Sequence, residues 1–514
     1  ACVRACVRAC VRACVRVCAR ACVRACVRAR GTRYGGNAAR LSAVLVLTVA
    51  SFTYVTAQIN ATGTIASVAL DIPFKIAVYV GLVSILLCSM LGGMRAVTWT
   101  QVAQYIVLII AYLLPVFWIS SKMGAGFFPH LMLGDEVARI AELEGQFGFV
   151  KNSAADLATV PKGLAGITKA HSSVNGTNWG FISLAICMMA GTASLPHVMM
   201  RYFTTPSVKS ARRSVAWSLL FIFILYSTAP MLATLSKLSL IDPTLSTGII
   251  GKSIAEVQAI DWYQNWNQAN LMFVSDFNGN GTLELNEFFM GGKAVVLATP
   301  EIAGLPYVIS GLVAAGGMAA AMSTADGLIL AIANALSHDL YYKIIDPKAE
   351  AAKRLIVARV LLVIIGFAGA TIAAMGIQGI LGSVIWAFDF AMSGLFFPLV
   401  LGVWWKRANG PGAVAGMLLG LGSGMAYLIW VRNGGSGFWG ITQLTFGIVG
   451  SLVSQSPILV LDEPTAALDP ETENALVQAL QVEREKRILI VIAHRLSTIR
   501  MADRICVVDD GRIV

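Results

Sequence analysis

The sequence predicts an all-α polytopic membrane protein with a disordered repeat at its N-terminus and a small α/β fragment at its C-terminus. Of its 514 residues, 57% are hydrophobic and only 13% are charged, whereas a soluble chain has roughly 25% charged residues. Apolar runs reach the roughly 20 residues that cross a bilayer, and Lys and Arg gather in alternate loops between them. This composition excludes a water-soluble enzyme of this size.

Charge divides the chain into three segments. Residues 1–40 contain ten Arg and no acid, 41–450 have a net charge of +4, and 451–514 have one of −3. The first segment is mostly an Ala-Cys-Val-Arg repeat, whose period of four matches neither a helix nor a strand. We favour a translated nucleotide repeat without selected structure. An Arg-rich presequence and a thiolate cluster for a soft metal are the alternatives.

Hydropathy predicts nine spans within residues 41–450, and a further apolar run at 438–455 is shortened or altered. The nine spans are 41–66, 74–93, 97–119, 178–200, 214–236, 305–337, 355–375, 381–404 and 412–431. Basic residues mark the loops on one side, with Arg95 in a tight turn and others near 201–213, 343–354 and 406–407. By the positive-inside rule, we expect an integral protein of the plasma (inner) membrane type with its N-terminus in the cytoplasm.

Polar residues within the spans are candidates for an ion site. Ser323 and Thr324 follow a run of small residues at 316–321, and two adjacent hydroxyls with a nearby backbone carbonyl can coordinate a hard cation such as Na⁺. The alternative is hydrogen bonding between helices or back to their own helix. Asp326 and Asp389 are functional candidates because a carboxylate buried in lipid is costly.

Five stretches carry a resemblance to a known family: 51–58, 92–101, 195–203, 322–326 and 407–413. With them, residues 41–450 resemble the sodium:solute symporter family, most closely its cation/acetate branch. The resemblance implies an inverted-repeat (LeuT-like) bundle with broken helices, and a secondary transporter rather than an enzyme. It also implies that Ser323 and Thr324 give side-chain oxygens to Na⁺ and that Ala320 gives its backbone carbonyl.

The resemblance begins at what corresponds to the third span of the family, so we expect an incomplete bundle. The two earlier spans include the first broken helix, which would complete the cation and substrate sites. The second broken helix is expected near 227–230, where Pro230 interrupts the hydrogen-bond ladder. The implied activity is Na⁺-coupled symport of a small monocarboxylate such as acetate. A partner that supplies the missing helices stays open, and we expect no nucleic-acid partner.

Residues 276–287 match the EF-hand pattern D-x-[DN]-x-[DN]-G-x₅-E in full. By this pattern, Ca²⁺ is bound by side-chain oxygens of Asp276, Asn278 and Asn280 and by the backbone carbonyl of Thr282. Glu284 binds directly or through water, and Glu287 binds with both carboxylate oxygens. We expect weak calcium binding in the micromolar-to-millimolar range, with local stiffening favoured over a regulatory switch. The alternative is a polar surface turn that matches by chance.

The C-terminal segment has a different character. An apolar strand at 457–464 ends in two acids, and a helix-like stretch at 471–486 and a second strand at 488–493 follow. This segment resembles the second half of an ABC-transporter nucleotide-binding domain. The family pattern implies that Asp462 holds Mg²⁺ through water, Glu463 is the general base, Asp469 belongs to the D-loop and His494 senses the γ-phosphate. The chain contains no G-x-x-x-x-G-K-[ST] loop, so binding of Mg-ATP would require a partner that supplies one.

Three interpretations follow. Residues 41–450 favour a Na⁺-coupled symporter, and residues 451–514 favour an ABC-type component that binds or hydrolyses ATP. The third is a chimeric or misassembled gene product without integrated activity, and the sharp junctions near residues 40 and 450 favour it for the exact chain.

Overall fold

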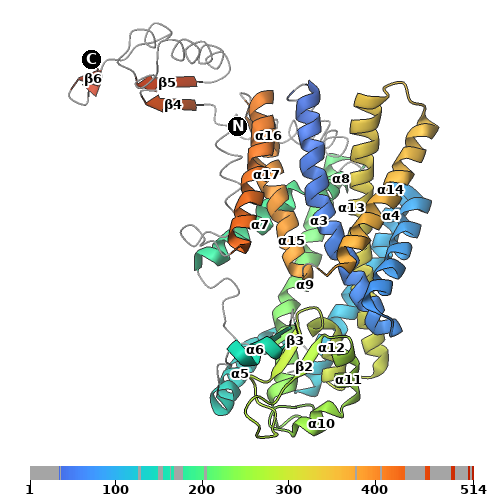
Figure 1. Cartoon of the computed structure of the whole chain (residues 1–514), viewed down its shortest axis with the longest axis vertical. Helices are drawn as coiled ribbons and strands as arrows, with labels where there is room; N and C mark the ends of the chain where they lie inside the picture. The colour runs from blue at the N-terminus through green and yellow to red at the C-terminus, as the bar shows by residue number, and fades with distance from the viewer. Residues whose placement is uncertain are drawn as a thin grey trace.

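The computed structural model describes residues 34, 36–124, 129–148, 154–161, 164–166, 178–201, 205–376, 379–405 and 408–433, and the backbone of four short strands after residue 457. In these residues, long helices form a bundle with a small mixed lobe at one end (Figure 1). Seven helices are long and apolar enough to cross a bilayer, and two shorter apolar helices are Phe74–Met90 and Ile182–Ser194. Each of the nine predicted spans coincides with one of these helices, which confirms the predicted membrane fold. The repeat before residue 34 and the run at 438–455 lie outside the described residues.

The bundle is built from helices of apolar residues whose polar backbone groups are satisfied within each helix. They are α3 (Gly36–Leu70), α4 (Phe74–Lys122), α7 (Asn178–Ser194), α8 (Pro196–Met200), α9 (Val208–Ile241), α13 (Tyr307–Asn334), α14 (Ala351–Ala374), α15 (Ile380–Ala391), α16 (Phe397–Trp404) and α17 (Gly410–Arg432). Two π-helical segments, η3 (Ala335–Ile345) and η4 (Met392–Phe396), continue α13 and α15. The first helix begins at Gly36, a few residues before the predicted span.

The long helix α4 doubles back midway. Lys293 Nζ lies 5.6 Å from the ring centre of Phe74 at its start, and Lys122 Nζ at its end donates a hydrogen bond of 3.0 Å to the Gly304 carbonyl. Lys293 and Gly304 flank one short helix, so both ends of α4 lie at the same end of the bundle. A straight helix of 49 residues would be about 74 Å long. The two spans predicted here, 74–93 and 97–119, are therefore both present.

Small residues bring α3 and the first half of α4 close together. A Cβ atom added to Gly63 would lie 2.5 Å from Val78 Cγ2, and one added to Gly81 would lie 3.1 Å from Thr62 Cβ. Helices in a bilayer associate through such close backbone approaches, since lipid gives them no hydrophobic drive to pair.

Contrary to the expected break near 227–230, α9 is one unbroken helix with Pro230 inside it. The hydroxyls of Ser227 and Thr228 donate hydrogen bonds of 3.0 and 3.1 Å to the Ile224 carbonyl. In membrane helices, such side-chain bonds help satisfy the backbone near a proline. Pro230 leaves the carbonyl of Tyr226, four residues earlier, without its helical donor, and the bonds to Ile224 do not replace that donor.

The lobe at the lower end in Figure 1 has its own sheet and core. It contains α5 (Leu133–Phe147), α10 (Ile254–Gln258), α11 (Asp261–Gln268), α12 (Val295–Ile302), and the strands β1 (Leu164–Gly166), β2 (Met272–Val274) and β3 (Phe288–Gly291), with the short η1 (Pro129–Met132) and α6 (Ala154–Thr159) nearby in sequence. The sheet is antiparallel in the order β1-β3-β2, and Met290 pairs with both Ala165 and Met272. Tyr263, Trp266 and Phe288 are buried in its core.

Charged side chains fix the lobe to the end of α9. The Asp242 carboxylate accepts hydrogen bonds from Thr244 N at 2.9 Å, Thr244 Oγ1 at 2.7 Å and Arg139 Nε of α5 at 3.3 Å. Lys237 of α9 pairs with Glu144 of α5. Burial raises the pKa of Asp242, but the bonds from Thr244 and Arg139 outweigh it and hold that pKa below its usual value.

The strands after residue 457 agree with the two predicted there. β4 (Ile458–Asp462) and β5 (Ile488–Ile492) pair in parallel, with Asp462 opposite Ile492. β6 (Val508–Asp509) and β7 (Arg512–Ile513) form an antiparallel pair. The helix-like stretch 471–486 lies outside the described residues.

We predict that Gly63→Ala destabilises the bundle by about 1–3 kcal/mol, because the added methyl group overpacks the contact with Val78. Thermal unfolding of the purified chain in detergent measures the effect. Gly422→Ala is the matched control, since a Cβ there meets no atom within 4 Å. Equal melting temperatures for the two variants would contradict the close helix approach.

We predict that Asp242→Asn lowers stability at pH 7 by about 1 kcal/mol, because the hydrogen bond from Arg139 loses its charge. Since folding depresses the pKa of Asp242, its contribution is present above the unfolded pKa of about 3.9 and disappears as the pH falls through the folded pKa. Unfolding curves of the wild type and the variant should therefore converge at acid pH. A difference that is independent of pH would refute this role.

Candidate functional site

The predicted ion-site residues lie together on one face of α13. Ser323 Oγ donates a hydrogen bond to the Ala320 carbonyl at 2.9 Å, and Thr324 Oγ1 donates one to the same carbonyl at 3.3 Å. Residues three and four apart share a helix face, so the helix alone brings the three oxygens together. All three residues are half-buried. The same bonds are the back-bonding that the sequence left as the alternative.

Gln101 of α4 reaches this site from the neighbouring helix. Its Nε2 donates a hydrogen bond of 2.5 Å to the Ser323 carbonyl, and its side chain also packs against Gly327 one turn further along. Gln101 belongs to one of the stretches that carry the resemblance, but the sequence gave no reason to place it at the ion site. The one sequence signal that could have indicated a role for Gln101 is an amide side chain within a mostly apolar span.

Four of the five stretches that carry the resemblance meet inside the bundle. The rings of Tyr54 and His197 lie 5.8 Å apart in an edge-on arrangement, and Gln101 contacts Ser323. A Cβ on Gly327 would lie 4.0 Å from His197 Cβ and 3.8 Å from Gln101 Nε2. Residues far apart in the sequence thus form one polar cluster between α3, α4, α8 and α13.

Both intramembrane carboxylates are fully buried inside the bundle. Ser89 Oγ donates a hydrogen bond of 3.0 Å to one oxygen of Asp326, and Ser393 Oγ donates one of 3.3 Å to one oxygen of Asp389. The second oxygen of each carboxylate has no hydrogen-bond partner among the described residues. Because an unsatisfied buried oxygen is costly, both side chains stay functional candidates.

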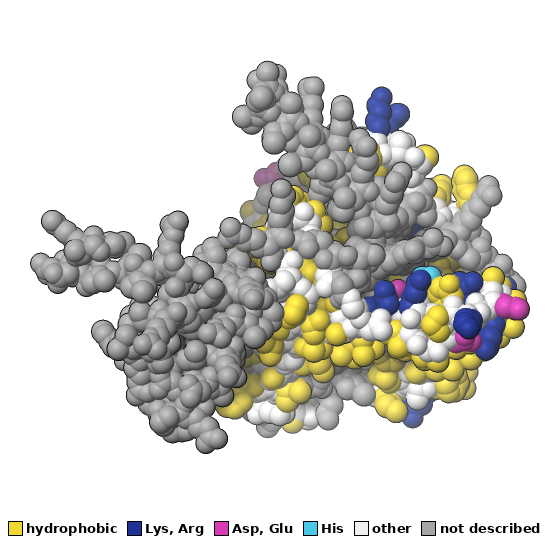
Figure 2. All heavy atoms as spheres, turned by 90° about the horizontal axis from the view of Figure 1, so that it is seen from above, with side chains coloured by type: hydrophobic (Ala, Val, Ile, Leu, Met, Phe, Trp, Pro, Cys, Tyr) yellow, Lys and Arg dark blue, Asp and Glu magenta, His cyan; other side chains and the backbone are white. Residues whose placement is uncertain are grey.

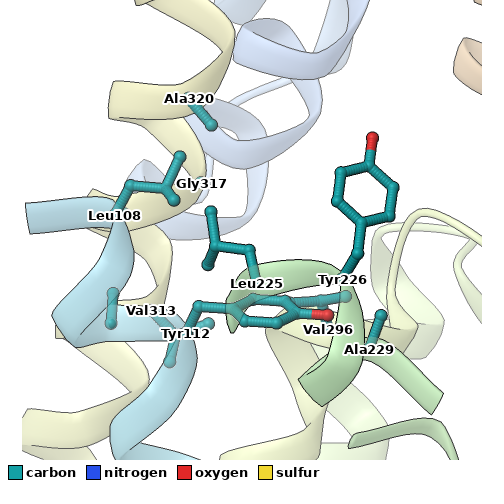
Figure 3. Close-up of a pocket in the computed structure, with 11 residues that line it drawn as sticks. Leu108, Tyr112, Leu225, Tyr226, Ala229, Val296, Val313, Gly317 and Ala320 are labelled. Atoms are coloured by element: carbon teal, nitrogen blue, oxygen red, sulfur yellow. The ribbon is translucent and has the colours of Figure 1, made fainter. Parts of the chain in front are cut away.

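A cavity of about 330 Å³ lies between α4, α9, α12 and α13 (Figure 3). Its lining is apolar except for Tyr112 and Tyr226, and Figure 3 shows Tyr112 lying across the cavity below Leu225. Ala320 lies in the wall of this cavity. One of the three residues of the candidate ion site therefore borders a space large enough for a small solute.

The calcium-loop residues lie in the lobe, between β2 and β3. Asp276, Asn278, Asn280 and Thr282 are exposed and Glu287 is fully buried. Among the described residues, no three His, Cys, Asp or Glu side chains converge as a metal site.

Of the predicted nucleotide-site residues, Asp462 ends β4, at the carboxyl edge of the parallel pair. The other three, Glu463, Asp469 and His494, lie outside the described residues.

Solved structures share the fold of this chain. A Na⁺-coupled sialic acid symporter, solved in a substrate-bound outward-open state, matches with a TM-score of 0.54 and 16% sequence identity, over 84% of this chain and 75% of that chain. The observed fold is thus the LeuT-like architecture that the resemblance implied.

Related sequences include transporters of several kinds. An uncharacterized symporter of Cupriavidus necator is 36% identical over 77% of this chain and 69% of its own length. A monocarboxylic acid transporter of Corynebacterium glutamicum is 26% identical, over 72% of this chain and 59% of its own length. A stretch of 86 residues is 40% identical to a glutathione/L-cysteine transport system ATP-binding/permease protein, CydC, of Haemophilus influenzae, over 17% of this chain and 15% of that protein.

The profile of the sodium:solute symporter family matches residues 29–244 and 293–420. These two ranges contain the small-residue run of α13, the hydroxyl pair and the helices that surround the cavity. The chain therefore belongs to the sodium:solute symporter family.

Proposed function

We propose that this chain forms part of a Na⁺-coupled symporter of small monocarboxylates. The observation that carries the proposal is the convergence of the Ala320 carbonyl with the hydroxyls of Ser323 and Thr324, beside a cavity whose wall includes Ala320. Hard cations are bound by oxygen ligands, and each hydroxyl oxygen keeps lone pairs that its present hydrogen bond does not use.

Binding of Na⁺ at this place needs only small changes. The hydroxyls of Ser323 and Thr324 would rotate, so that their lone pairs and the Ala320 carbonyl face the ion instead of one another. Gln101 would hold the Ser323 carbonyl and with it the local course of α13. The family resemblance assigns the remaining ligands to a helix that precedes the family's third span, and this chain spans 69% and 59% of the first two relatives.

The cavity favours a small solute with a short apolar part. Its wall is apolar, and the hydroxyls of Tyr112 and Tyr226 are the polar groups available for hydrogen bonding. A carboxylate that enters such a space requires a nearby positive charge, which Na⁺ beside Ala320 would supply. The relative named as a monocarboxylic acid transporter supports acetate or a similar acid as the substrate.

Basic residues support an orientation in the membrane. Lys209 and Arg212 lie at the start of α9, Lys343 lies near the end of η3, and Lys353 and Arg354 lie in the first turn of α14. These positions are at the end of the bundle opposite to the lobe, where Figure 2 shows Lys and Arg side chains beside hydrophobic ones. The positive-inside rule assigns this end to the cytoplasm and the lobe to the outside, in a plasma (inner) membrane.

A second candidate function concerns the C-terminal segment alone. The parallel pair of β4 and β5 with Asp462 at its carboxyl edge supports descent of residues 451–514 from an ABC nucleotide-binding domain, and the similarity of an 86-residue stretch of the chain to CydC is consistent with it. A partner with a G-x-x-x-x-G-K-[ST] loop would have to supply the phosphate cradle for Mg-ATP.

We predict that a Na⁺ gradient drives acetate uptake into proteoliposomes containing this chain, and that the same gradient of K⁺ does not. The double change Ser323→Ala and Thr324→Ala should raise the Na⁺ concentration for half-maximal uptake more than about tenfold, which corresponds to about 1.4 kcal/mol of lost binding energy. Ser310→Ala, on the same helix and more than two turns away, is the control. Unchanged Na⁺ dependence in the double variant would rule out this ion site.

We predict that the purified chain hydrolyses ATP only when a protein with an intact phosphate-binding loop is added, because the chain lacks that loop. Release of inorganic phosphate measures the activity, and Glu463→Gln should abolish it. Hydrolysis that persists in this variant would exclude Glu463 as the general base.

A further inference from the structure

The proposed transport function makes no use of the loop at residues 276–287. The loop joins β2 to β3 in the lobe, and the family profile passes over residues 245–292. The EF-hand pattern therefore lies in a segment that the family match does not explain, and its contacts can be considered on their own.

Glu287, at the twelfth position of the pattern, is fully buried. Its Oε1 accepts a hydrogen bond of 2.9 Å from Phe277 N, and its Oε2 accepts one of 3.0 Å from Glu284 N. Both carboxylate oxygens thus face back across the loop. No Lys, Arg or His of the described residues forms an ion pair with Glu287. The charge of this buried carboxylate is thus stabilised by two backbone N–H donors and by no side-chain cation, so a bound cation would stabilise it further.

Asp276 and Asn278, at the first and third positions of the pattern, accept hydrogen bonds from backbone N–H groups of the same loop. Asp276 accepts hydrogen bonds from Gly279 N at 2.7 Å and Gly281 N at 3.0 Å, and Asn278 Oδ1 accepts one from Asn280 N at 2.9 Å. Both glycines have φ near +70°, a conformation that glycine adopts without steric cost. Since carboxylate and amide oxygens have more than one lone pair, these bonds leave room for a cation.

Further contacts bring the middle of the loop together. The side-chain amides of Asn278 and Asn280 both donate hydrogen bonds of 2.9 Å to Glu284 Oε1, so the third, fifth and ninth positions of the pattern meet. At the eighth position, Leu283 is buried in the lobe core and exchanges two hydrogen bonds of 2.8 Å with the backbone of Gly251 and Lys252. The packing of Leu283 and its two backbone hydrogen bonds thus fix the loop to the rest of the lobe.

The chemical type of the ligand atoms in the loop determines which ion it prefers. It consists of carboxylate, amide and backbone oxygens, with no Cys or His, which excludes a soft transition metal as the preferred ligand. A flexible loop with several neutral oxygens suits Ca²⁺ better than Mg²⁺, which demands a tight octahedron.

We propose that residues 276–287 bind one Ca²⁺ ion, which compensates the buried Glu287 and stabilises the lobe. The site is connected to the bundle by a short stretch of chain. β3 follows Glu287 directly and is followed by α12, whose Val296 lines the cavity. With three carboxylates among the ligands, the site belongs to the weak class, with a Kd of about 0.1–1 mM.

Equilibrium dialysis of the purified full chain against radioactive Ca²⁺ tests the proposal. We expect one bound Ca²⁺ per chain, and affinities at least about tenfold lower for Glu287→Gln and for Asp276→Asn, each of which removes a charged ligand. Asp276 is exposed, so its variant tests the site even where Glu287→Gln fails to fold. Glu256→Gln removes an exposed acid from α10 in the same lobe and should bind as the wild type does.

A second readout follows the lobe itself. Hydrogen exchange of the backbone amides of α11 reports local opening of the lobe, and Ca²⁺ should slow that exchange in the wild type and not in Asp276→Asn. The proposal is overturned if the wild type binds no Ca²⁺ at millimolar concentration, if both variants bind as tightly as the wild type, or if Mg²⁺ displaces Ca²⁺ at equal concentration. Since none of these measurements involves transport, their outcome is independent of the proposed symport.

Discussion

Close packing of α13 against α3 and α4 is the constraint on which the rest of the bundle depends. A Cβ on Gly317 would lie 3.1 Å from Ile65 Cδ1, and Gly316 leaves no room for a side chain beside Ala111. Only small side chains on α13 permit this approach. Because the helices are so close, Gln101 can reach the backbone of α13, and Ala320 lies in the wall of a cavity between the helices.

The membrane helices were predictable because their signal is local. A run of about 20 apolar residues must cross the bilayer as a helix, and the spacing of Ala320, Ser323 and Thr324 places them on one face of that helix. The role of Pro230 was not predictable in this way. A proline within an apolar run is compatible both with a broken helix and with a helix that continues with one backbone bond missing, and α9 is of the second kind.

The lobe shows the other limit of prediction from sequence. Its core residues, such as Tyr263 and Trp266, come from helices and strands only a few residues long, and β1 pairs with β3 across more than a hundred residues. Such long-range pairing is set by tertiary contacts that local propensity does not contain. The position of Gln101 beside Ser323 is of the same kind. By contrast, the twelve-residue EF-hand pattern was visible because its residues are contiguous.

The point at which the lobe enters and leaves the bundle has an evolutionary consequence. Ile241, at the end of α9, and Ala294, just before α12, belong to the same buried cluster, and the family profile resumes at residue 293 after ending at 244. An insertion whose two ends pack together adds a domain without displacing the elements that flank it. The segment at residues 245–292 is therefore the part of the lobe that a lineage can acquire, exchange or discard, whereas α5, β1 and α12 lie within the family match.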